Sequence, residues 1–282
     1  MATIIDGKQI AQIIKDRVAD RVKRMPAPPN LATILVGDDP GSLVYLAGKE
    51  KACNEAGIGF TLHKLPHDTP QEALIDLIDR LNNDAGVHGI LPQQPFPSHI
   101  DTHEIVSRVD PRKDVDCLNP YNIGLVTAGN PAIPPATPYG IITMLKESNI
   151  PMEGKNCVII GRSNIVGKPM AMLMLMQNAT VTICHSKTAN LPYITSQADI
   201  VIAAMRKPRF VTGEMIKEGA VVIDVGINRL EGKKICGDVD FKSCRDKASY
   251  ITKVPGGVGP VTIATLLSNC VKAWELCNAA KQ

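Results

Sequence analysis

Two side chains in the stretch SLVYLAGKEKACNEAG have a spacing that suits proton transfer. The stretch is predicted to be helical, and Tyr45 and Lys49 are four residues apart, so both project from the same side of the helix. In a partly dry cleft, desolvation lowers the pKa of a lysine toward the range that proton transfer requires. A surface contact is the commoner explanation of such a pair, so the spacing alone leaves both interpretations open.

A second candidate site lies in the stretch NCVIIGRSNIVGKPM, residues 156–170. An apolar strand leads into a turn that opens with Gly161 and closes with Gly167, and a helix is predicted to follow. In doubly wound folds such a turn presents backbone N–H groups and a helix N-terminus to the pyrophosphate of a dinucleotide. The middle glycine of the G-x-G-x-x-G pattern is absent, and Arg162 and Ser163 follow Gly161. A tight structural turn is the alternative interpretation.

The next strand indicates which dinucleotide would bind. NAD sites usually place Asp or Glu about 20 residues beyond the first glycine, where the carboxylate accepts a hydrogen bond from the ribose hydroxyl. Here the strand TVTIC ends in His185-Ser186-Lys187-Thr188, without a carboxylate. Arg162, Ser186 and Lys187 can instead supply cations and a hydroxyl to a 2′-phosphate. The sequence therefore predicts NADP, although a solvated basic rim would also explain Lys187.

The elements around these residues predict an α/β protein with two α/β domains around a cleft. The second half contains four apolar runs, NCVIIG, TVTICH, DIVIAA and AVVIDVG, separated by helical or loop segments. This alternation is typical of a doubly wound, Rossmann-like parallel sheet. The first half contains the strand-like runs LATILVG, GFTLHKL and VHGILPQ with helical segments between them.

Turn and cap signals predict three local features. A helix in TPQEALIDLIDRLNND is predicted to have Thr69 as its N-cap. The proline-rich region from Gln94 to Pro138 is predicted to be an irregular crossing between the domains. A last helix is expected to open at Pro260 and to pack back on the first domain.

Composition excludes several function classes. The chain has 282 residues and a formal net charge of +3, too small and too evenly spread to indicate nucleic-acid binding. No apolar run approaches the roughly 20 residues of a membrane span, and eight scattered cysteines suggest reduced thiols, so a cytoplasmic protein is expected. His99, Asp101 and His103 lie on a proline-flanked stretch without helical register, so no metal site is predicted.

The ordered motifs resemble those of the bifunctional methylenetetrahydrofolate dehydrogenase/cyclohydrolase family (FolD type). They are VYLAGKEKAC, VHGILPQQPFP, KDVDCLNP, PATPYG, GRSNIVGKP, HSKT, DVGIN and VPGGVGPVT, and they span essentially the whole chain. The resemblance implies NADP-dependent oxidation of 5,10-methylenetetrahydrofolate, followed by hydrolysis of the methenyl product to 10-formyltetrahydrofolate, in one-carbon metabolism. It also implies tetrahydrofolate substrates and a homodimer.

The resemblance assigns roles to residues of this sequence. Lys49 corresponds to the central catalytic group of the hydrolysis step, Tyr45 to the ring that stacks on the folate, and Gln93 to the amide that hydrogen-bonds the lysine. Asp116 corresponds to the anchor of the pterin's amino edge. The remaining implied contacts are Gly256, Gly257 and Pro260 with the folate, and Gly161, Arg162, Ser163, Gly167, Ser186, Lys187 and Ile227 with the cofactor.

The domain assignment follows from the same resemblance. Residues 1–137, completed by the C-terminal helix 260–282, are expected to form the folate-binding catalytic domain. Residues 138–259 are expected to form the NADP-binding domain.

Several positions depart from the family pattern. Pro92 and Gln94 replace two apolar residues, and Pro92 suggests an edge strand or a distorted strand end beside Gln93. Arg206 and Arg209 stand where the family usually has glycines, so a positive φ at Arg206 would strain its loop and weaken the dehydrogenase assignment. Two alternatives follow: a folate-binding protein or cyclohydrolase with impaired dehydrogenase activity, and a shikimate-type dehydrogenase.

Overall fold

The computed structural model describes residues 1–230 and 235–279, which fold into two compact units. The six-stranded unit contains Met1–Gln12 and Thr137–Thr262, and the three-stranded unit contains Ile13–Ala136 and the described residues from Ile263 onward. Helices α1 (Gly7–Val22) and α10 (Val258–Ala279) each begin in the six-stranded unit and end in the other. Within the described residues, no helix has both the length and the apolar character of a bilayer span.

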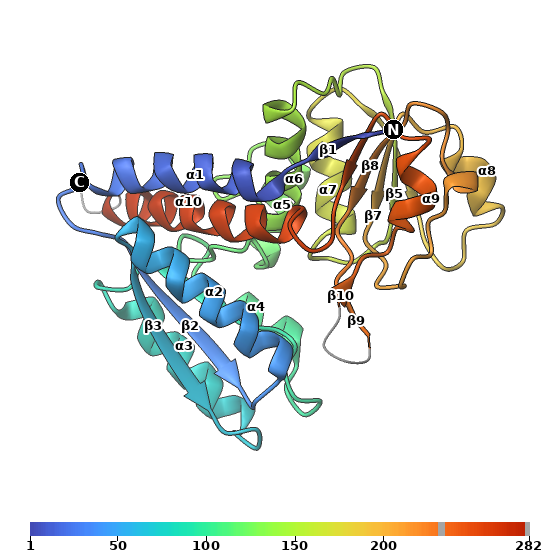
Figure 1. Ribbon diagram of the computed structural model, residues 1–282. Coiled ribbons are helices and arrows are strands. Elements are labelled where there is room, and N and C mark those ends of the chain that lie inside the picture. The colour runs from blue at the N-terminus through green and yellow to red at the C-terminus, as the bar shows by residue number, and fades with distance from the viewer. Residues whose placement is uncertain (231–234, 280–282) are drawn as a thin grey trace. The chain divides into compact units, whose positions relative to one another are not determined.

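The three-stranded unit is built on a parallel sheet with the order β3-β2-β4. Because the crossovers from β2 to β3 and from β3 to β4 run in opposite directions, their right-handedness places α2 and α3 on opposite faces of the sheet, as Figure 1 shows. The elements are β2 (Asn30–Val36), α2 (Pro40–Ala56), β3 (Gly59–Leu65), α3 (Gln71–Asn83), β4 (Gly89–Pro92), α4 (Thr102–Arg108) and α5 (Pro120–Thr127).

Alternation along β2 divides the core of this unit into two layers. Ala32 and Ile34 belong to a buried cluster that includes Leu74 and Ile78 of α3. The other face carries α2 (Figure 1) and also α10, since a Cβ on Gly89 would lie 3.6 Å from Sγ of Cys270 in α10. Asn269 of α10 donates hydrogen bonds of 2.8 Å to the carbonyl oxygens of Val115 and Pro134. These bonds satisfy buried backbone acceptors and fix the helix in register.

The six-stranded unit contains an all-parallel sheet with the order β1-β11-β8-β7-β5-β6. The four apolar runs predicted as a parallel sheet form β5, β6, β7 and β8, so the predicted fold class is confirmed. The elements are β1 (Thr3–Ile5), α6 (Ala136–Glu147), β5 (Asn156–Ile160), α7 (Gly167–Leu175), β6 (Thr180–Cys184), α8 (Leu191–Thr195), β7 (Ile200–Ala203), η1 (Gly213–Met215), β8 (Val221–Asp224), β9 (Asn228–Arg229), β10 (Ile235–Cys236), α9 (Phe241–Arg245) and β11 (Tyr250–Thr252).

The order of these strands places a topological switch point between β5 and β7. The chain moves from β5 outward to β6 on one side, and then returns to place β7 on the other side of β5. In doubly wound sheets, ligands bind at the carboxyl ends of the strands that flank such a point. The turn after β5 and the loop after β7 are therefore the first places to look for a cofactor site.

Three local predictions were wrong. Thr69 does not cap α3: its hydroxyl donates to the carbonyl oxygen of Pro66 at 2.7 Å, and α3 begins at Gln71 with Pro70 as an N-cap that makes no side-chain hydrogen bond. The region from Gln94 to Pro138 contains α4 and α5, which are seven and eight residues long and too short for a clear periodic signal. Helix α10 begins at Val258 rather than Pro260.

Candidate active site

Lys49 is a buried amine on α2. The helix is fixed at its start by Asp39, whose carboxylate accepts from the N–H of Ser42 at 2.7 Å. Lys49 lies near the middle of α2 and is 7% exposed. It donates from Nζ to Oε1 of Gln93 at 2.8 Å. A buried amine with a single neutral acceptor is desolvated without being neutralised by an ion pair, which favours its uncharged form.

Gln93, and not its neighbour Gln94, supplies the amide that contacts the lysine. The N–H of Gln93 donates to Ile34 at 2.8 Å, so the sheet ladder continues for one bond past Pro92, the last residue of edge strand β4. Gln93 also donates from Nε2 to the backbone carbonyl of Gln94 at 2.8 Å. This second bond sets the amide orientation so that Oε1 faces Lys49. The expectation that Pro92 marks an edge strand is confirmed.

Tyr45 lies on the same side of α2 as Lys49. The lysine Nζ is 5.9 Å from the centroid of the tyrosine ring, a cation–π distance. Burial raises the pKa of Tyr45, and the negative charge of Asp116 raises it further. The phenol is therefore neutral at physiological pH, and its ring is available as an apolar surface.

Asp116 is held near the lysine by a turn that packs beside β4. Ile90 bridges in parallel to Asp114 and donates its N–H to Lys113 at 2.7 Å. The Asp114 carboxylate accepts from the N–H groups of Leu118 and Asn119 at 3.1 and 2.8 Å, which closes the turn around Asp116. Asp114 is thus a positioning group that the sequence analysis missed.

Cys117, directly after Asp116, has a φ of +58°. Glycine adopts this left-handed conformation more readily than cysteine does.

The charges of Lys49 and Asp116 each act on the pKa of the other in the direction opposite to burial. Burial lowers the pKa of Lys49, and the charge of Asp116 partly restores it. Burial raises the pKa of Asp116 to about 6, although the lysine acts in the opposite direction. An amine that loses its proton more easily than usual and a carboxyl that titrates near neutrality form a site where protons move at little cost.

The turn after β5 requires glycine at both of its ends. Gly161 has a φ of +137°, and a Cβ there would lie 2.2 Å from the carbonyl oxygen of Ala204. A Cβ on Gly167 would lie 2.2 Å from the carbonyl oxygen of Gly161. Ser163 closes the turn internally, because its hydroxyl accepts from the N–H of Val166 at 3.1 Å. No side chain fits at either glycine, and the N–H groups of Gly167 and Lys168 at the start of α7 are bonded within the turn, to Oγ and to the carbonyl oxygen of Ser163 at 3.4 and 3.0 Å.

The predicted 2′-phosphate ligands follow two neighbouring strands. β5 and β6 pair up to Ile160 and Cys184, and the N–H of Gly161 donates to Cys184 at 2.8 Å. Arg162 and Ser186 therefore follow the ends of adjacent parallel strands, and both are exposed, as is Lys187. Exposed cations and a hydroxyl beside a tight glycine turn fit the phosphates of NADP.

The other predicted contacts also belong to the six-stranded unit. Ile227 follows β8 and is 42% exposed. Gly256 has a φ of +101°, and Gly257 packs so closely that a Cβ on Gly7 would lie 1.8 Å from its carbonyl oxygen. Pro260 is in the first turn of α10. The Lys49 group and these residues are thus two separate sets, each within its own unit.

Arg206 and Arg209 both adopt the left-handed conformation, with φ values of +57° and +52°. The backbone at Arg206 is therefore strained as expected, because the left-handed region costs a non-glycine residue roughly 1–2 kcal/mol. The loop nevertheless holds its shape through contacts with Asp238, a buried residue that the sequence analysis missed. Its only sequence signal is an acidic residue between Gly237 and Val239 in a short apolar run.

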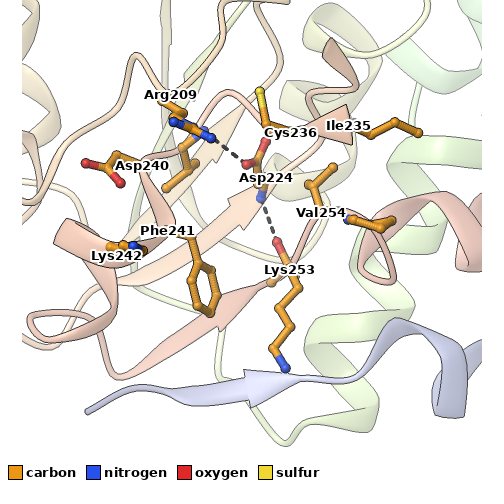
Figure 2. A pocket seen from close by; sticks show the side chains of 13 residues that line it. Arg209, Asp224, Ile235, Cys236, Asp240, Phe241, Lys242, Lys253 and Val254 are labelled. Carbon is orange, nitrogen blue, oxygen red and sulfur yellow. Dashed lines mark hydrogen bonds between the residues drawn. The ribbon is translucent and has the colours of Figure 1, made fainter. Parts of the chain in front are cut away.

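A pocket of about 490 Å³ lies beside Asp224 in the six-stranded unit. Figure 2 shows Asp224 among the residues that line it, with Arg209 and Phe241 on one side and Val254 on the other. Its lining includes none of the predicted site residues. Burial raises the pKa of Asp224 to about 6, although three backbone N–H groups oppose that shift.

The histidine-rich stretch before α4 has a structural role. Asp101 caps α4 by accepting from the N–H of His103 at 2.8 Å, and His99 contacts the carbonyl oxygen of Thr69 through Nε2 at 3.0 Å. In the part of the chain that the structure describes, no group of three or more His, Cys, Asp or Glu side chains is arranged to hold a metal ion.

Comparisons with known proteins match the whole chain. Residues 5–116 match the model of the tetrahydrofolate dehydrogenase/cyclohydrolase catalytic domain, and residues 135–278 match the model of the NAD(P)-binding domain of the same family. The chain is 51% identical to the Bifunctional protein FolD of Pelobacter propionicus over 276 residues, which cover 97% of this chain and 98% of that protein.

Two solved structures have nearly the same fold. The FolD methylenetetrahydrofolate dehydrogenase/cyclohydrolase of Campylobacter jejuni superposes with a TM-score of 0.95 and 46% identity, covering 98% of this chain and 99% of the other. The methylenetetrahydrofolate dehydrogenase–cyclohydrolase of Trypanosoma brucei, complexed with NADP cofactor and inhibitor, superposes with a TM-score of 0.94 and 38% identity. That match covers 100% of this chain and 99% of the other.

Proposed function

Because the chain belongs to the tetrahydrofolate dehydrogenase/cyclohydrolase family, we propose that it oxidises 5,10-methylenetetrahydrofolate with NADP and hydrolyses the methenyl product to 10-formyltetrahydrofolate. The observation that carries the proposal is the buried amine of Lys49, held by Gln93 beside the Tyr45 ring and within the field of Asp116. A neutral pterin ring system suits stacking on Tyr45, and a cationic methenyl carbon suits attack by a water that the Lys49 amine positions.

Hydrolysis is assigned to the Lys49 group. The methenyl carbon is already electrophilic, so the reaction requires a positioned water and a group that exchanges protons. Lys49 performs both tasks, since its amine is desolvated and its orientation is fixed by the 2.8 Å bond to Gln93. Tyr45 orients the folate by stacking, and the Asp116 carboxylate accepts from the pterin's amino edge. No metal is required for this chemistry.

Oxidation is assigned to the NADP site of the six-stranded unit. NADP, when bound, accepts the hydride. The chain's contribution is to bind and orient: Gly161 and Gly167 shape the turn, Ser163 closes it, and Arg162, Ser186 and Lys187 hold the 2′-phosphate. Ile227 borders the cofactor from the loop after β8, while Gly256, Gly257 and Pro260 border the folate.

The domain roles follow from this assignment. We assign folate binding and hydrolysis to residues 1–137 completed by 260–282, and NADP binding to residues 138–259, as the sequence indicates. Strand β1 is part of the six-stranded sheet, so the first residues of the chain also support the cofactor-binding fold.

One absorbance experiment tests the function. The purified protein is mixed with methylenetetrahydrofolate and either NAD or NADP, and NADPH and the methenyl product are followed at their separate wavelengths. The proposal requires NADPH formation, a preference for NADP, and decay of added methenyltetrahydrofolate. Hydrolysis without NADPH formation would favour the impaired dehydrogenase, and oxidation of shikimate in place of folate would favour the alternative enzyme class.

We also propose a homodimer in the cytoplasm. Strand β6 is the last strand of its sheet among the described residues, so its outer edge is open to a strand of a second copy. All eight cysteines are free thiols, which fits a reducing compartment. Sedimentation equilibrium of the pure protein tests the dimer, and fractionation of cells that express it tests the location.

A further inference from the structure

Two loops leave the carboxyl edge of the six-stranded sheet from neighbouring strands. The loop after β7 carries Arg206 in the left-handed conformation, and the loop after β8 leads through Ile227 to Asn228, the first residue of β9. β7 and β8 pair in parallel up to Ala203 and Asp224, so the loops start side by side. Beyond those residues a single buried carboxylate joins them.

That carboxylate belongs to Asp238. It accepts from three consecutive backbone N–H groups, those of Met205, Arg206 and Lys207, at 2.7, 2.9 and 2.8 Å. It also accepts from the side-chain amide of Asn228 in the other loop at 2.8 Å. Asp238 is 0% exposed, so water does not compete for these bonds, and charge-assisted bonds in such surroundings are strong.

Asp238 is itself fixed by the end of β8. The carboxylate of Asp224 accepts from the N–H groups of Asp238 and Val239 at 2.9 and 3.0 Å. Glycines make the approach possible: a Cβ on Gly237 would lie 1.7 Å from Oδ2 of Asp224, and a Cβ on Gly226 would lie 2.3 Å from Cγ of Asp238. The two carboxylates therefore tie the strand end and both loops into one rigid network.

We propose that Asp238 is a positioning residue for NADP, because it holds the loops after β7 and β8 at a fixed separation at the carboxyl edge of the sheet, where doubly wound sheets bind their ligands. This role rests on the proposed function. Asp238 is 0% exposed, so the proposed role requires no contact with substrate or cofactor. Its effect is geometric, since a misplacement of about 1 Å at a reacting centre can lower a rate roughly 100-fold.

The test compares Asp238→Asn with Asp240→Asn. An asparagine keeps the shape but replaces one acceptor oxygen with an N–H₂ group that faces the loop donors. Asp240 is two residues away, and its side chain makes no cap hydrogen bond to α9. For each variant, the kcat and KM for NADP-dependent oxidation, the rate of methenyltetrahydrofolate hydrolysis, the NADP dissociation constant by calorimetry, and amide exchange at residues 205–207 are measured.

For Asp238→Asn we expect at least a 10-fold loss of kcat/KM in oxidation, weaker NADP binding and faster amide exchange at 205–207. Hydrolysis is expected to stay within two-fold of the original rate, because its residues belong to the other unit. Asp240→Asn is expected to change none of these values. Unchanged oxidation, or an equal loss of both activities with a lower melting temperature, would overturn the proposal.

A second variant keeps the test decisive if Asp238→Asn does not fold. Asn228→Ala removes only the bond from the loop after β8, so it is expected to weaken oxidation by a smaller factor with hydrolysis intact. An Asn228→Ala protein with unchanged oxidation and unchanged NADP affinity would contradict the positioning role of Asp238. If the unaltered protein oxidises no folate, the proposed function fails, whereas calorimetry and amide exchange still report on Asp238.

Discussion

The amine of Lys49 and the side-chain oxygen of Gln93 lie 2.8 Å apart, and the other end of the Gln93 amide donates to the carbonyl oxygen of Gln94. The lysine thus points in a direction that the backbone at the end of β4 determines. A fixed, desolvated amine is what the hydrolysis step needs, and Gln93 is the residue that fixes it.

Gln93→Leu removes the acceptor of Lys49 while keeping a side chain of similar size. We expect hydrolysis of methenyltetrahydrofolate to fall about 10–100-fold, because the amine loses its orientation. Gln94→Ala is the matched control, since Gln94 contributes its backbone carbonyl to this contact. Initial rates of methenyltetrahydrofolate decay distinguish the two variants. An equal effect of both would show that Gln93 does not act through Lys49.

Folate binding should depend on the protonation of Asp116. Burial raises the pKa of this carboxyl to about 6, so the carboxylate proposed to accept from the pterin exists above that pH and is lost below it. The KM for methylenetetrahydrofolate is therefore expected to rise as the pH falls from 7 to 5. Asp116→Asn should raise the KM at pH 7 and flatten the profile, whereas a wild-type KM independent of pH in this range would contradict the role.

The choice of cofactor should depend on Arg162. Arg162→Ala removes the charged partner proposed for the 2′-phosphate, and a bond of about 1.5–3 kcal/mol corresponds to roughly 10–100-fold weaker NADP binding. NAD binding should change little. Lys168→Ala is the control, because Lys168 lies in the same segment but donates to Asn164 at 2.7 Å. Calorimetric titration with both cofactors measures the effect, and an equal loss for NAD and NADP would contradict the assignment.

The left-handed residues in the loop after β7 should cost stability. Arg206→Gly relieves roughly 1–2 kcal/mol of backbone strain and loses about 0.5–1 kcal/mol to the greater freedom of glycine in the unfolded chain. We expect a net gain of about 0.5–1 kcal/mol in the free energy of unfolding for this change, and the same for Arg209→Gly. Lys207→Gly, at a position without positive φ, should destabilise. Denaturant titration orders the three variants, and a Lys207→Gly protein as stable as the others would exclude strain as the cause.

The sequence was most informative where a pattern is local. The apolar runs that became β5 to β8 were recognisable because a parallel strand is buried on both faces. Helices α4 and α5 were missed because each is only two turns long and starts at a cap, Asp101 or Asn119, inside a proline-rich region. Thr69 was misassigned because its hydroxyl bonds backward to Pro66.

Contacts between distant segments could not be predicted from periodicity. The approach of Asp116 to Lys49 depends on the pairing of Ile90 with Asp114, and the role of Asp238 depends on loops that follow two other strands. Neither pairing leaves a repeating signal in the sequence. The left-handed backbone at Arg206 was anticipated only through the glycine that the family pattern leads one to expect there.

The most direct measurement for the account as a whole is the hydrolysis rate of Lys49→Met, a variant that keeps the apolar stem and removes the amine. General acid–base catalysis contributes about 100–10,000-fold, so we expect a loss of at least 100-fold, with NADP affinity unchanged. Lys51→Met, two residues along the same helix at an exposed lysine near Glu55, should hydrolyse at the original rate. A Lys49→Met protein that hydrolyses methenyltetrahydrofolate as fast as the unaltered one would contradict the account.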